Sequence, residues 1–151
     1  MIDILIVFLA KYLIILPVAF IIFFWAKSGP RERREIFYLA FLSLPISYIA
    51  ARCVSHFYFD PRPFVSEGIV PLMAHAADNG FPSDHTLLAA SLAALVYVWD
   101  KKWGIVLSVT ALIIGGARVL AGVHHSVDIL GSFVISWIAV WIGKSLAKVY
   151  L

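Results

Sequence analysis

The chain has 151 residues, of which 62% are hydrophobic and 14% are charged, and its mean hydropathy is +0.94. Soluble domains carry roughly 25% charged residues, because polar side chains must cover their surface, so this composition excludes a soluble globular domain and indicates a membrane protein. The formal net charge of +3 does not indicate a nucleic-acid partner, since the cations lie between apolar segments, as topology signals do. Cys53 is the single cysteine, which excludes a disulfide framework and a thiolate metal site.

Five apolar segments have the length of roughly 17–25 residues that a helix needs to cross a bilayer. They are residues 2–26, 36–56, 83–99, 103–120 and 126–149. The first is too long for the core of a signal peptide and lacks a small-residue cleavage site, so we interpret it as a retained span. Pro17 and Pro45 lie inside the first two segments, where neighbouring helices tolerate a kink. The sequence therefore predicts an all-α fold, a polytopic membrane helix bundle of about five transmembrane helices in one domain over residues 1–151.

Lys and Arg residues in the short connections predict the orientation, because they are retained on the cytoplasmic side. If the chain crosses the membrane five times, eight of its twelve Lys and Arg residues fall on one side of the membrane, which we take as the cytoplasmic side. These eight are Lys27, Arg31, Arg33, Arg34, Lys101, Lys102, Lys144 and Lys148. The N-terminus and the connections 57–82 and 121–125 then face the exterior, and all five histidines lie at that side. The sequence thus predicts one chemically active face, outside the cell or in the periplasm.

The connection before the fifth segment carries a polar motif, ARVLAGVHHSVD from residue 117. His124 and Asp128 are four residues apart, so they share a face if the fifth helix begins by His124. A carboxylate on an imidazole fixes its tautomer and raises its basicity, which prepares the other ring nitrogen to act as nucleophile or base. His125 pairs with Ile129 at this spacing, so the pattern selects His124. A helix-capping Asp beside an interfacial His is the simpler alternative.

A second motif, FPSDH over residues 81–85, begins the third segment. Proline followed by Ser83 and Asp84 is typical of a helix start, and the amides of a helix N-terminus attract anions such as phosphate. Ser83 offers a further hydrogen bond, and His85 stands one residue into the helix beside such an anion. The alternative is an ordinary N-cap formed by Ser83 or Asp84.

In a third motif, YFDPRPF over residues 58–64, Pro61 and Pro63 stiffen the backbone around Arg62. Arginine binds planar oxyanions with two hydrogen bonds, so Arg62 and Arg118 would neutralise the equatorial oxygens of a phosphoryl group during transfer. The alternative is a rigid turn whose arginine binds lipid headgroups. Because all three motifs fall on one predicted face and supply complementary groups, phosphoryl transfer is the favoured interpretation.

Together, Arg-Pro, Pro-Ser-x-His and Arg-x5-His-x3-Asp resemble the three-part signature of the type 2 phosphatidic acid phosphatase superfamily, over about residues 52–132. The stretches YFDPRPFV, HAADNGFPSDH and GVHHSVDILGS are most similar to undecaprenyl-diphosphate phosphatases of the bacitracin-resistance type. Asp84, where the wider superfamily usually has Gly, is the most telling match to that branch. The site residues implied by the resemblance are His124, Asp128 and His85 as catalytic groups and Arg62, Ser83 and Arg118 as phosphate-binding groups.

The resemblance also implies a mechanism and a substrate. His124 attacks the terminal phosphorus of a lipid diphosphate to give a phosphohistidine, while His85 protonates the leaving lipid monophosphate and then activates water. The implied substrate is undecaprenyl diphosphate, hydrolysed at the outer face of the cytoplasmic membrane during carrier-lipid recycling for cell-wall synthesis, which removes the target of bacitracin. The expected partners are this lipid and membrane lipids. No metal or other cofactor is implied, and the sequence offers no carboxylate cluster of the two-metal phosphatase kind.

Two positions depart from the superfamily pattern. Ser55 stands where a Lys is common, and Arg52, one helical turn away, is the candidate to replace it. Ala117 stands where a Ser usually precedes the Arg of the third motif, so a hydrogen bond expected there cannot form. Neither change removes the nucleophile or the acid.

Alternatives with other lipids or without catalysis stay open. The same chemistry fits phosphatidate, phosphatidylglycerophosphate or a lipid A phosphate. A non-enzymatic proton or anion conductor would use the same His and Asp residues as a relay, and a small structural membrane subunit is a third reading. His56, His75 and Asp78 either line the entrance or anchor the chain at the interface. Gly115, Gly116 and Gly131 are expected to permit close helix contacts.

Overall fold

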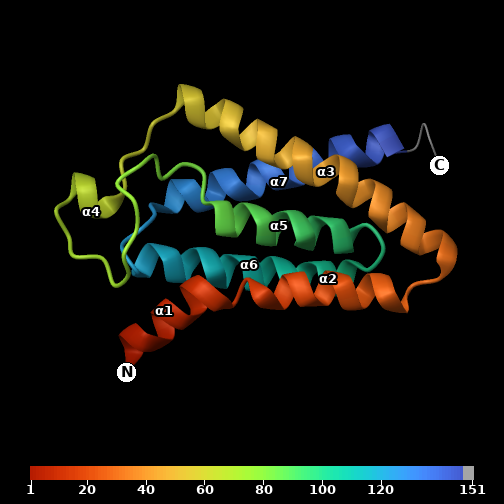
Figure 1. The fold of residues 1–151 in the computed structure, drawn as a ribbon, viewed down its shortest axis with the longest axis horizontal. Coiled ribbons are helices and arrows are strands. Elements are labelled where there is room, and N and C mark those ends of the chain that lie inside the picture. Colours follow the sequence, from red (N-terminus) through yellow and green to blue (C-terminus); the bar gives the residue numbers. More distant parts are fainter. Residues whose placement is uncertain (148–151) are drawn as a thin grey trace.

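Helices make up the regular structure of residues 1–147, the part of the chain described by the structure, which is a computed structural model. Within that part they are α1 (Ile2–Tyr12), α2 (Ile15–Lys27), α3 (Pro30–Phe57), α4 (Pro63–Ser66), α5 (Asp84–Tyr97), α6 (Lys101–Leu120) and α7 (Ser126–Ala147). Figure 1 shows a bundle in which α2, α3, α6 and α7 run alongside a central α5. The prediction of an all-α bundle is confirmed. The end of the fifth predicted segment, residues 148–149, lies outside the described residues.

The first predicted span is a bent pair of helices instead of one helix. α1 and α2 meet at a break with a bend of 40°. Pro17 has no N–H to donate to Leu13, four residues earlier, and the Leu13 oxygen instead accepts a 3.0 Å bond from Leu16. The break therefore lies one turn before the proline. It leaves carbonyl groups at the end of α1 without helical partners.

The central helix, α5, is shorter than the third predicted segment. Its 14 residues span about 21 Å, less than the roughly 30 Å of a hydrocarbon core. By length and apolar character, α3, α6, α7 and the α1–α2 pair are the candidates to cross the membrane. Ser83, immediately before α5, is fully buried, so the N-terminus of this helix is recessed within the bundle.

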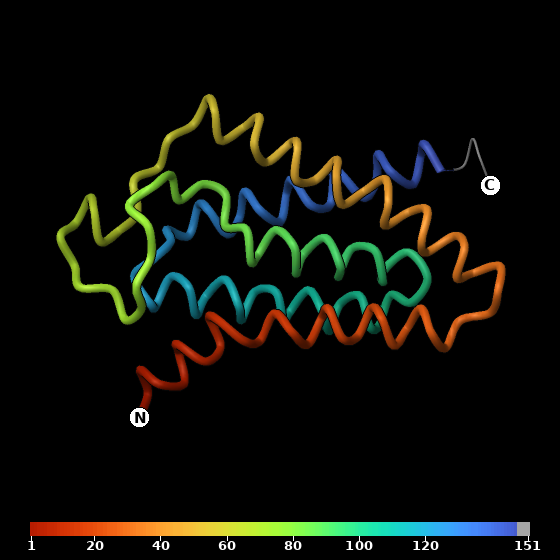
Figure 2. Tube along the Cα trace, in the orientation of Figure 1, coloured from red at the N-terminus to blue at the C-terminus, as the bar shows by residue number. Residues whose placement is uncertain are grey.

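The two ends of the bundle differ in chemistry, and Figure 2 shows which segments of the chain lie at each end. The α2–α3 and α5–α6 connections and the described end of α7 lie at one end, which carries Lys27, Lys101 and Lys144. The N-terminus, α4 with its flanking loops and the α6–α7 connection lie at the other end. The predicted separation of a basic end from an end rich in histidine is therefore present. Lys148, which was part of that prediction, lies outside the described residues.

Buried serines pair across the bundle where α3, α5 and α7 meet. The hydroxyl oxygens of Ser47 and Ser91 are 3.0 Å apart, and Ser91 donates to Ser136 over 3.1 Å. Ser136 in turn donates to the carbonyl of Leu87 over 2.8 Å. These bonds satisfy polar groups that neither lipid nor apolar side chains can satisfy, and they fix α5 between its neighbours.

Two of the three glycines expected to allow close helix contacts do so. A Cβ at Gly115 would overlap Ile129 of α7, and a Cβ at Gly131 would overlap the ring of Phe81. The expectation was wrong for Gly116, because a Cβ there meets nothing within 4 Å.

Alanine substitution should therefore have opposite effects at two of these glycines. Gly116→Ala is expected to stabilise the protein, because alanine favours a helix by about 1 kcal/mol over glycine and its methyl group meets no other atom. Gly131→Ala is expected to destabilise it by about 1–3 kcal/mol, the usual effect of overpacking against a ring such as Phe81. Thermal unfolding of both variants in the same detergent measures the difference. Equal shifts would contradict the close packing at Gly131.

Candidate active site

Two arginines converge on His124 at the histidine-rich end of the bundle. Nη1 of Arg62 and Nη2 of Arg118 each lie 3.2 Å from Nε2 of His124. All three side chains are buried, with exposed fractions of 5% or less. Arg62 precedes α4 and Arg118 lies in the last turn of α6, while His124 lies in the α6–α7 connection. We call Arg62, Arg118 and His124 the phosphate cup.

The hydrogen bonds of His124 fix its tautomer. A guanidinium group has only donors, so Nε2 must be the unprotonated acceptor for Arg62 and Arg118. The ring proton therefore sits on Nδ1, which donates to Oδ2 of Asp128 over 3.0 Å. Helix α7 begins two residues after His124, yet the i, i+4 contact predicted from the spacing is present.

Asp128 is a fully buried carboxylate held from two sides. Its Oδ2 also accepts a 3.0 Å hydrogen bond from the backbone N–H of His125. Because the backbone and the imidazole donate to the same oxygen, the carboxylate cannot turn without breaking both bonds. The arrangement orients Nε2 of His124 toward the arginines.

The protonation of His124 differs from the sequence-based expectation. Burial, followed by the positive charges of Arg118 and Arg62, lowers the pKa of His124 to about 2. Burial and the two arginines therefore outweigh the increase in the basicity of His124 that was expected from Asp128. The ring is therefore neutral at physiological pH, and the Nε2 lone pair needs no deprotonation before it can attack.

Arg62 is held by its prolines and by two other loops. Pro63 begins α4, and Arg62 is the residue before it, in an extended conformation. Its Nη1 donates to the carbonyl of Val123 over 2.7 Å, and its Nε donates to Oδ1 of Asp78 over 2.8 Å. These bonds leave the guanidinium little freedom to turn away from His124.

Arg118 is hydrogen-bonded to the end of α1, next to the break between α1 and α2. Its Nη1 donates over 3.2 Å to the carbonyl of Ala10, one of the groups at the end of α1. Its Nη2 lies 3.1 Å from Nε2 of His75. The N-terminal helix thus positions an arginine 108 residues further along the chain.

Ser83 and His85 lie at the recessed start of α5. The hydroxyl of Ser83 makes no N-cap hydrogen bond and instead accepts one from Thr86 over 3.2 Å, so its own proton is free to be donated. The ordinary N-cap alternative therefore does not describe this residue. His85 is half-buried, and its ring lies within electrostatic range of Arg118 and His75. Within residues 1–147 it forms no side-chain hydrogen bond with Arg62 or His124.

Asn79, which the sequence analysis did not select, ties the loops of the site together. Its side-chain amide donates to the carbonyls of Ser55 and Tyr58 over 3.0 and 2.9 Å. Its oxygen accepts from the backbone N–H groups of Asp60 and Phe81, each over 3.0 Å. One side chain thereby links the end of α3, the segment before Arg62 and the segment before α5.

Comparison with known proteins agrees with this geometry. The family model for the PAP2 superfamily matches residues 36–148. The chain belongs to the PAP2 superfamily. The predicted family, and with it the prediction of a lipid phosphatase, is confirmed, since the matched region includes all three motifs.

Named relatives and one solved structure extend this result. The chain is 32% identical to undecaprenyl-diphosphatase BcrC of Bacillus subtilis over 137 residues, which cover 89% of this chain and 69% of that protein. It is 28% identical to bacitracin transport permease protein BcrC of Bacillus licheniformis, covering 81% of this chain and 60% of that one. The crystal structure of LpxE from Aquifex aeolicus aligns with 95% of this chain, and the alignment covers 86% of the LpxE chain. The TM-score is 0.76 and the sequence identity is 23%, so the two proteins share a fold.

The departures from the PAP2 pattern have structural consequences. Ser55, at the position where a Lys is common, accepts a 3.1 Å hydrogen bond from Asn79. Arg52 does not reach the phosphate cup, because it pairs with Asp84 over 2.6 Å, one residue from both Ser83 and His85. Ala117 is buried against α1, where its methyl group packs against Ala10.

His125 makes contacts that the helical spacing did not predict. Its Nδ1 lies 2.8 Å from Asp60 and its Nε2 lies 3.3 Å from Glu67. Carboxylates only accept, so both ring nitrogens donate and the imidazole is positively charged. Burial alone would lower the pKa of His125, but the hydrogen bonds to Asp60 and Glu67 raise it above the usual value. His125 thus connects the segment before Arg62 to the start of α7.

The raised pKa of His125 predicts a pH-dependent contribution to stability. A histidine whose pKa is higher in the folded state stabilises that state fully below its unfolded pKa of about 6.5, and this contribution is lost as the pH rises through the folded value. Relative to the wild type, His125→Asn should unfold at a lower temperature at pH 5.5. The difference should shrink at pH 9. A difference that grows with pH would contradict the charged assignment.

One group of residues has a spacing that could hold a metal ion. Ligand atoms of Asp60, His125 and Asp128 lie within 4.8 Å of one another, a cluster that the sequence analysis did not foresee. Within the cluster Nδ1 of His125 lies 2.8 Å from Oδ2 of Asp60, and the backbone N–H of His125 donates to Oδ2 of Asp128. The cluster is therefore described as a hydrogen-bonded network.

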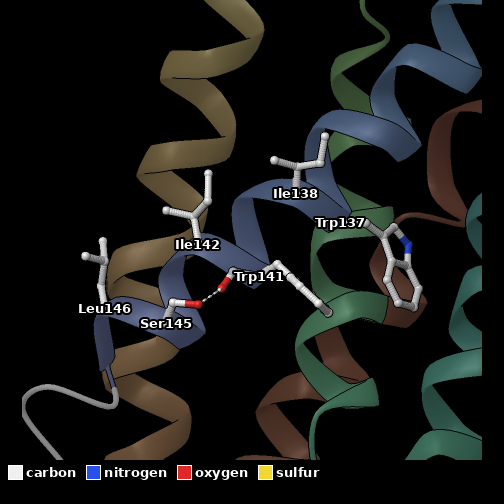
Figure 3. A pocket seen from close by; sticks show the side chains of 6 residues that line it. All are labelled: Trp137, Ile138, Trp141, Ile142, Ser145 and Leu146. Atoms are coloured by element: carbon white, nitrogen blue, oxygen red, sulfur yellow. Dashed lines mark hydrogen bonds between the residues drawn. The ribbon is translucent and has the colours of Figure 1, made fainter.

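Two hollows on the helix surfaces differ in their position relative to the cup: one lies apart from it on α7, and the other begins beside the start of α5. Figure 3 shows an apolar hollow of about 460 Å³ on α7, lined by Trp137, Ile138, Trp141, Ile142, Ser145 and Leu146. It lies along the half of α7 away from Asp128 and offers no acid, base or nucleophile. A second hollow, of about 410 Å³, lies between α3 and α5 and is lined by Leu44, Ser47, Tyr48, Asp84, Leu87, Leu88 and Ser91. This one begins at Asp84, beside the start of α5.

Proposed function

We propose that this protein hydrolyses undecaprenyl diphosphate to undecaprenyl phosphate and phosphate, with His124 as the nucleophile. The observation that carries the proposal is the convergence of Arg62 and Arg118 on Nε2 of a neutral His124 whose Nδ1 donates to Asp128. This arrangement supplies a nucleophile, a group that orients it and two cations for the phosphoryl oxygens. The relative named undecaprenyl-diphosphatase supports the choice of substrate.

In the first step, Nε2 of His124 attacks the terminal phosphorus, and the bond to the bridging oxygen breaks. The bridging oxygen takes the electron pair and accepts a proton from His85, so undecaprenyl phosphate leaves. Burial and the charge of Arg118 lower the pKa of His85 to about 4, so the donor is a protonated His85 that forms when the negatively charged substrate binds beside it. Asp128 stabilises the positive ring of the phosphohistidine through its bond to Nδ1. Once the phosphorus is bonded to Nε2, the donors of Arg62 and Arg118 that converge there bind the phosphoryl oxygens, with Ser83 as a further donor.

In the second step, neutral His85 takes a proton from a water molecule as that water attacks the phosphohistidine. The phosphorus–nitrogen bond breaks, its electron pair returns to Nε2, and phosphate leaves. His124 and His85 are then restored to their starting protonation states. Residues of this chain alone supply every proton transfer in the cycle.

The lipid chain is proposed to lie in the hollow between α3 and α5. Its lining of leucines and Tyr48 suits an isoprenoid. Asp84, at the end of the hollow beside the start of α5, is adjacent to Ser83 and His85. A headgroup in the cup and a tail in this hollow would place the substrate at the boundary between water and lipid. The basic connections lie at the opposite end of the bundle, which supports a cytoplasmic membrane location with the site facing the exterior or periplasm.

A panel of purified lipid phosphates tests the proposed substrate. Undecaprenyl diphosphate should give the highest kcat/KM when compared with phosphatidate, phosphatidylglycerophosphate and a lipid A phosphate, in mixed micelles of one composition. The diphosphate should also release one phosphate per molecule and leave undecaprenyl phosphate as the product. Equal or faster turnover of the monoesters would overturn the substrate choice while leaving the phosphatase chemistry in place.

A further inference from the structure

His75, in the loop between α4 and α5, adjoins the phosphate cup without belonging to the three-part signature of the superfamily. Its Nε2 lies 3.1 Å from Nη2 of Arg118, the same nitrogen that lies 3.2 Å from Nε2 of His124. The rings of His75 and His124 have centroids 6.0 Å apart and stand edge to face. His75 is half-buried whereas His124 is buried, so His75 lies on the entrance side of the same guanidinium.

Carboxylates lie beside the cup before any anion is bound. Asp78 forms an ion pair with Arg62, and Asp128 is hydrogen-bonded to His124. Asp78 is bonded directly to Arg62 at the entrance, where it opposes the approach of an anion. A lipid diphosphate carries more negative charge than a lipid monophosphate, so its binding calls for an additional positive group near the entrance.

His75 is built to supply that charge. Because Arg118 donates to Nε2, His75 is neutral and carries its proton on Nδ1, a buried atom. Burial, followed by the charges of Arg62 and Arg118, lowers the pKa of His75, while a backbone hydrogen bond with Ala76 and the charge of Asp78 act in the opposite direction. The other titratable groups near His75 are His124 and His85. A histidine is either neutral or positively charged, so neither of them adds a negative charge beside His75. When Arg118 turns to a bound phosphoryl group, Nε2 of His75 is freed to take up a proton.

We propose that His75 is a specificity-determining residue that takes up a proton and donates a hydrogen bond to the second, non-transferred phosphate of a diphosphate substrate. In an in-line transfer the leaving phosphate lies on the far side of the transferred phosphorus from His124, which is the entrance side where His75 stands. A lipid monophosphate has no group at this place. This inference rests on the proposed function and adds to it the residue that distinguishes the diphosphate from the monoester.

The test compares two substrates that differ by one phosphate, farnesyl diphosphate and farnesyl monophosphate. In His75→Asn, KM for the diphosphate should rise about tenfold or more, as expected for a lost hydrogen bond to a charged group, with KM for the monophosphate changed by about twofold at most. In the wild type, KM for the diphosphate should increase as the pH rises from 6 to 9, and this dependence should be absent in His75→Asn. His75→Lys, which keeps a positive charge, should restore the preference for the diphosphate without the pH dependence.

The control is His56→Asn, which replaces an exposed histidine on α3 and should leave both KM values unchanged. Partial misfolding of a variant lowers kcat for both substrates alike and does not change KM, so the ratio of KM values isolates the binding effect. Equal changes for the two substrates in His75→Asn would overturn the role of His75 while leaving the proposed function intact. Hydrolysis of neither substrate by the wild type would overturn both.

Discussion

Replacing His124 with alanine is expected to abolish phosphate release, with a loss of about 10⁴-fold or more in kcat. The reason is that both cup arginines converge on Nε2 of His124, whereas His75, the neighbouring imidazole, contacts Arg118 but not Arg62. Phosphate release from undecaprenyl diphosphate in detergent micelles is the measurement. KM should change far less than kcat, because Arg62 and Arg118 remain to bind the phosphate.

His56→Asn serves as the matched control for this experiment, since it removes an imidazole that is exposed on α3. It should retain wild-type turnover. Retained phosphate release in His124→Ala would remove the basis for the phosphohistidine route. It would favour the reading in which these residues form a proton or anion relay without catalysis.

The second large effect is expected for Asp128→Asn, with a loss of about 10³–10⁴-fold in kcat. Oδ2 of Asp128 accepts from both Nδ1 of His124 and the N–H of His125, and these two bonds select the tautomer that leaves Nε2 unprotonated. An amide has one oxygen and one NH₂ group, and it cannot offset the positive charge that forms on the ring during attack. The tautomer and the stabilisation of the phosphohistidine are therefore lost together.

A carboxylate outside the cup is the control for Asp128→Asn. Glu35 pairs with the exposed Arg31 at the opposite, basic end of the bundle, and such surface pairs contribute little, so Glu35→Gln should keep turnover within about threefold of the wild type. Both variants should show the unfolding midpoint of the wild type to within a few degrees if their effects are chemical. Comparable losses of turnover in the two variants would contradict the specific role of Asp128.

The sequence predicted the site residues through local spacing and through motifs. The four-residue interval between His124 and Asp128 predicted their contact, which is present even though α7 begins only at Ser126. The prolines around Arg62 predicted a held guanidinium, and Arg62 is fixed by the carbonyl of Val123. These features depend on a few neighbouring residues, which is why a sequence pattern can express them.

Contacts between distant segments were not predictable in the same way. The bond from Arg118 to the carbonyl of Ala10 involves a backbone group that every residue has, so no residue type marks it. Asn79 and His75 act through loop geometry, and partners such as Asp60 for Asn79 and Arg118 for His75 lie 19 and 43 residues away. His125 was set aside because helical spacing directed it toward Ile129, whereas its loop position directs it to Asp60.

The helices also combine features that the sequence predicted with features that it did not. Hydropathy predicted the positions of all the main helices, but it gave no signal for the recessed start of α5. The break between α1 and α2 follows from Pro17, yet its position one turn before the proline depends on the Leu13–Leu16 hydrogen bond. Burial of Ser83, which recesses the helix N-terminus, is a property of the assembled bundle.

The central claim is a covalent phosphate on Nε2 of His124, and a rapid-quench experiment tests it most directly. The wild-type protein is mixed with undecaprenyl diphosphate labelled in its terminal phosphate, quenched with base during turnover and digested for mass spectrometry. We predict label on the peptide containing His124, stable in base, lost in acid and absent from His124→Ala. An active preparation that accumulates no such label, even when His85→Ala slows hydrolysis of the intermediate, would contradict the covalent mechanism.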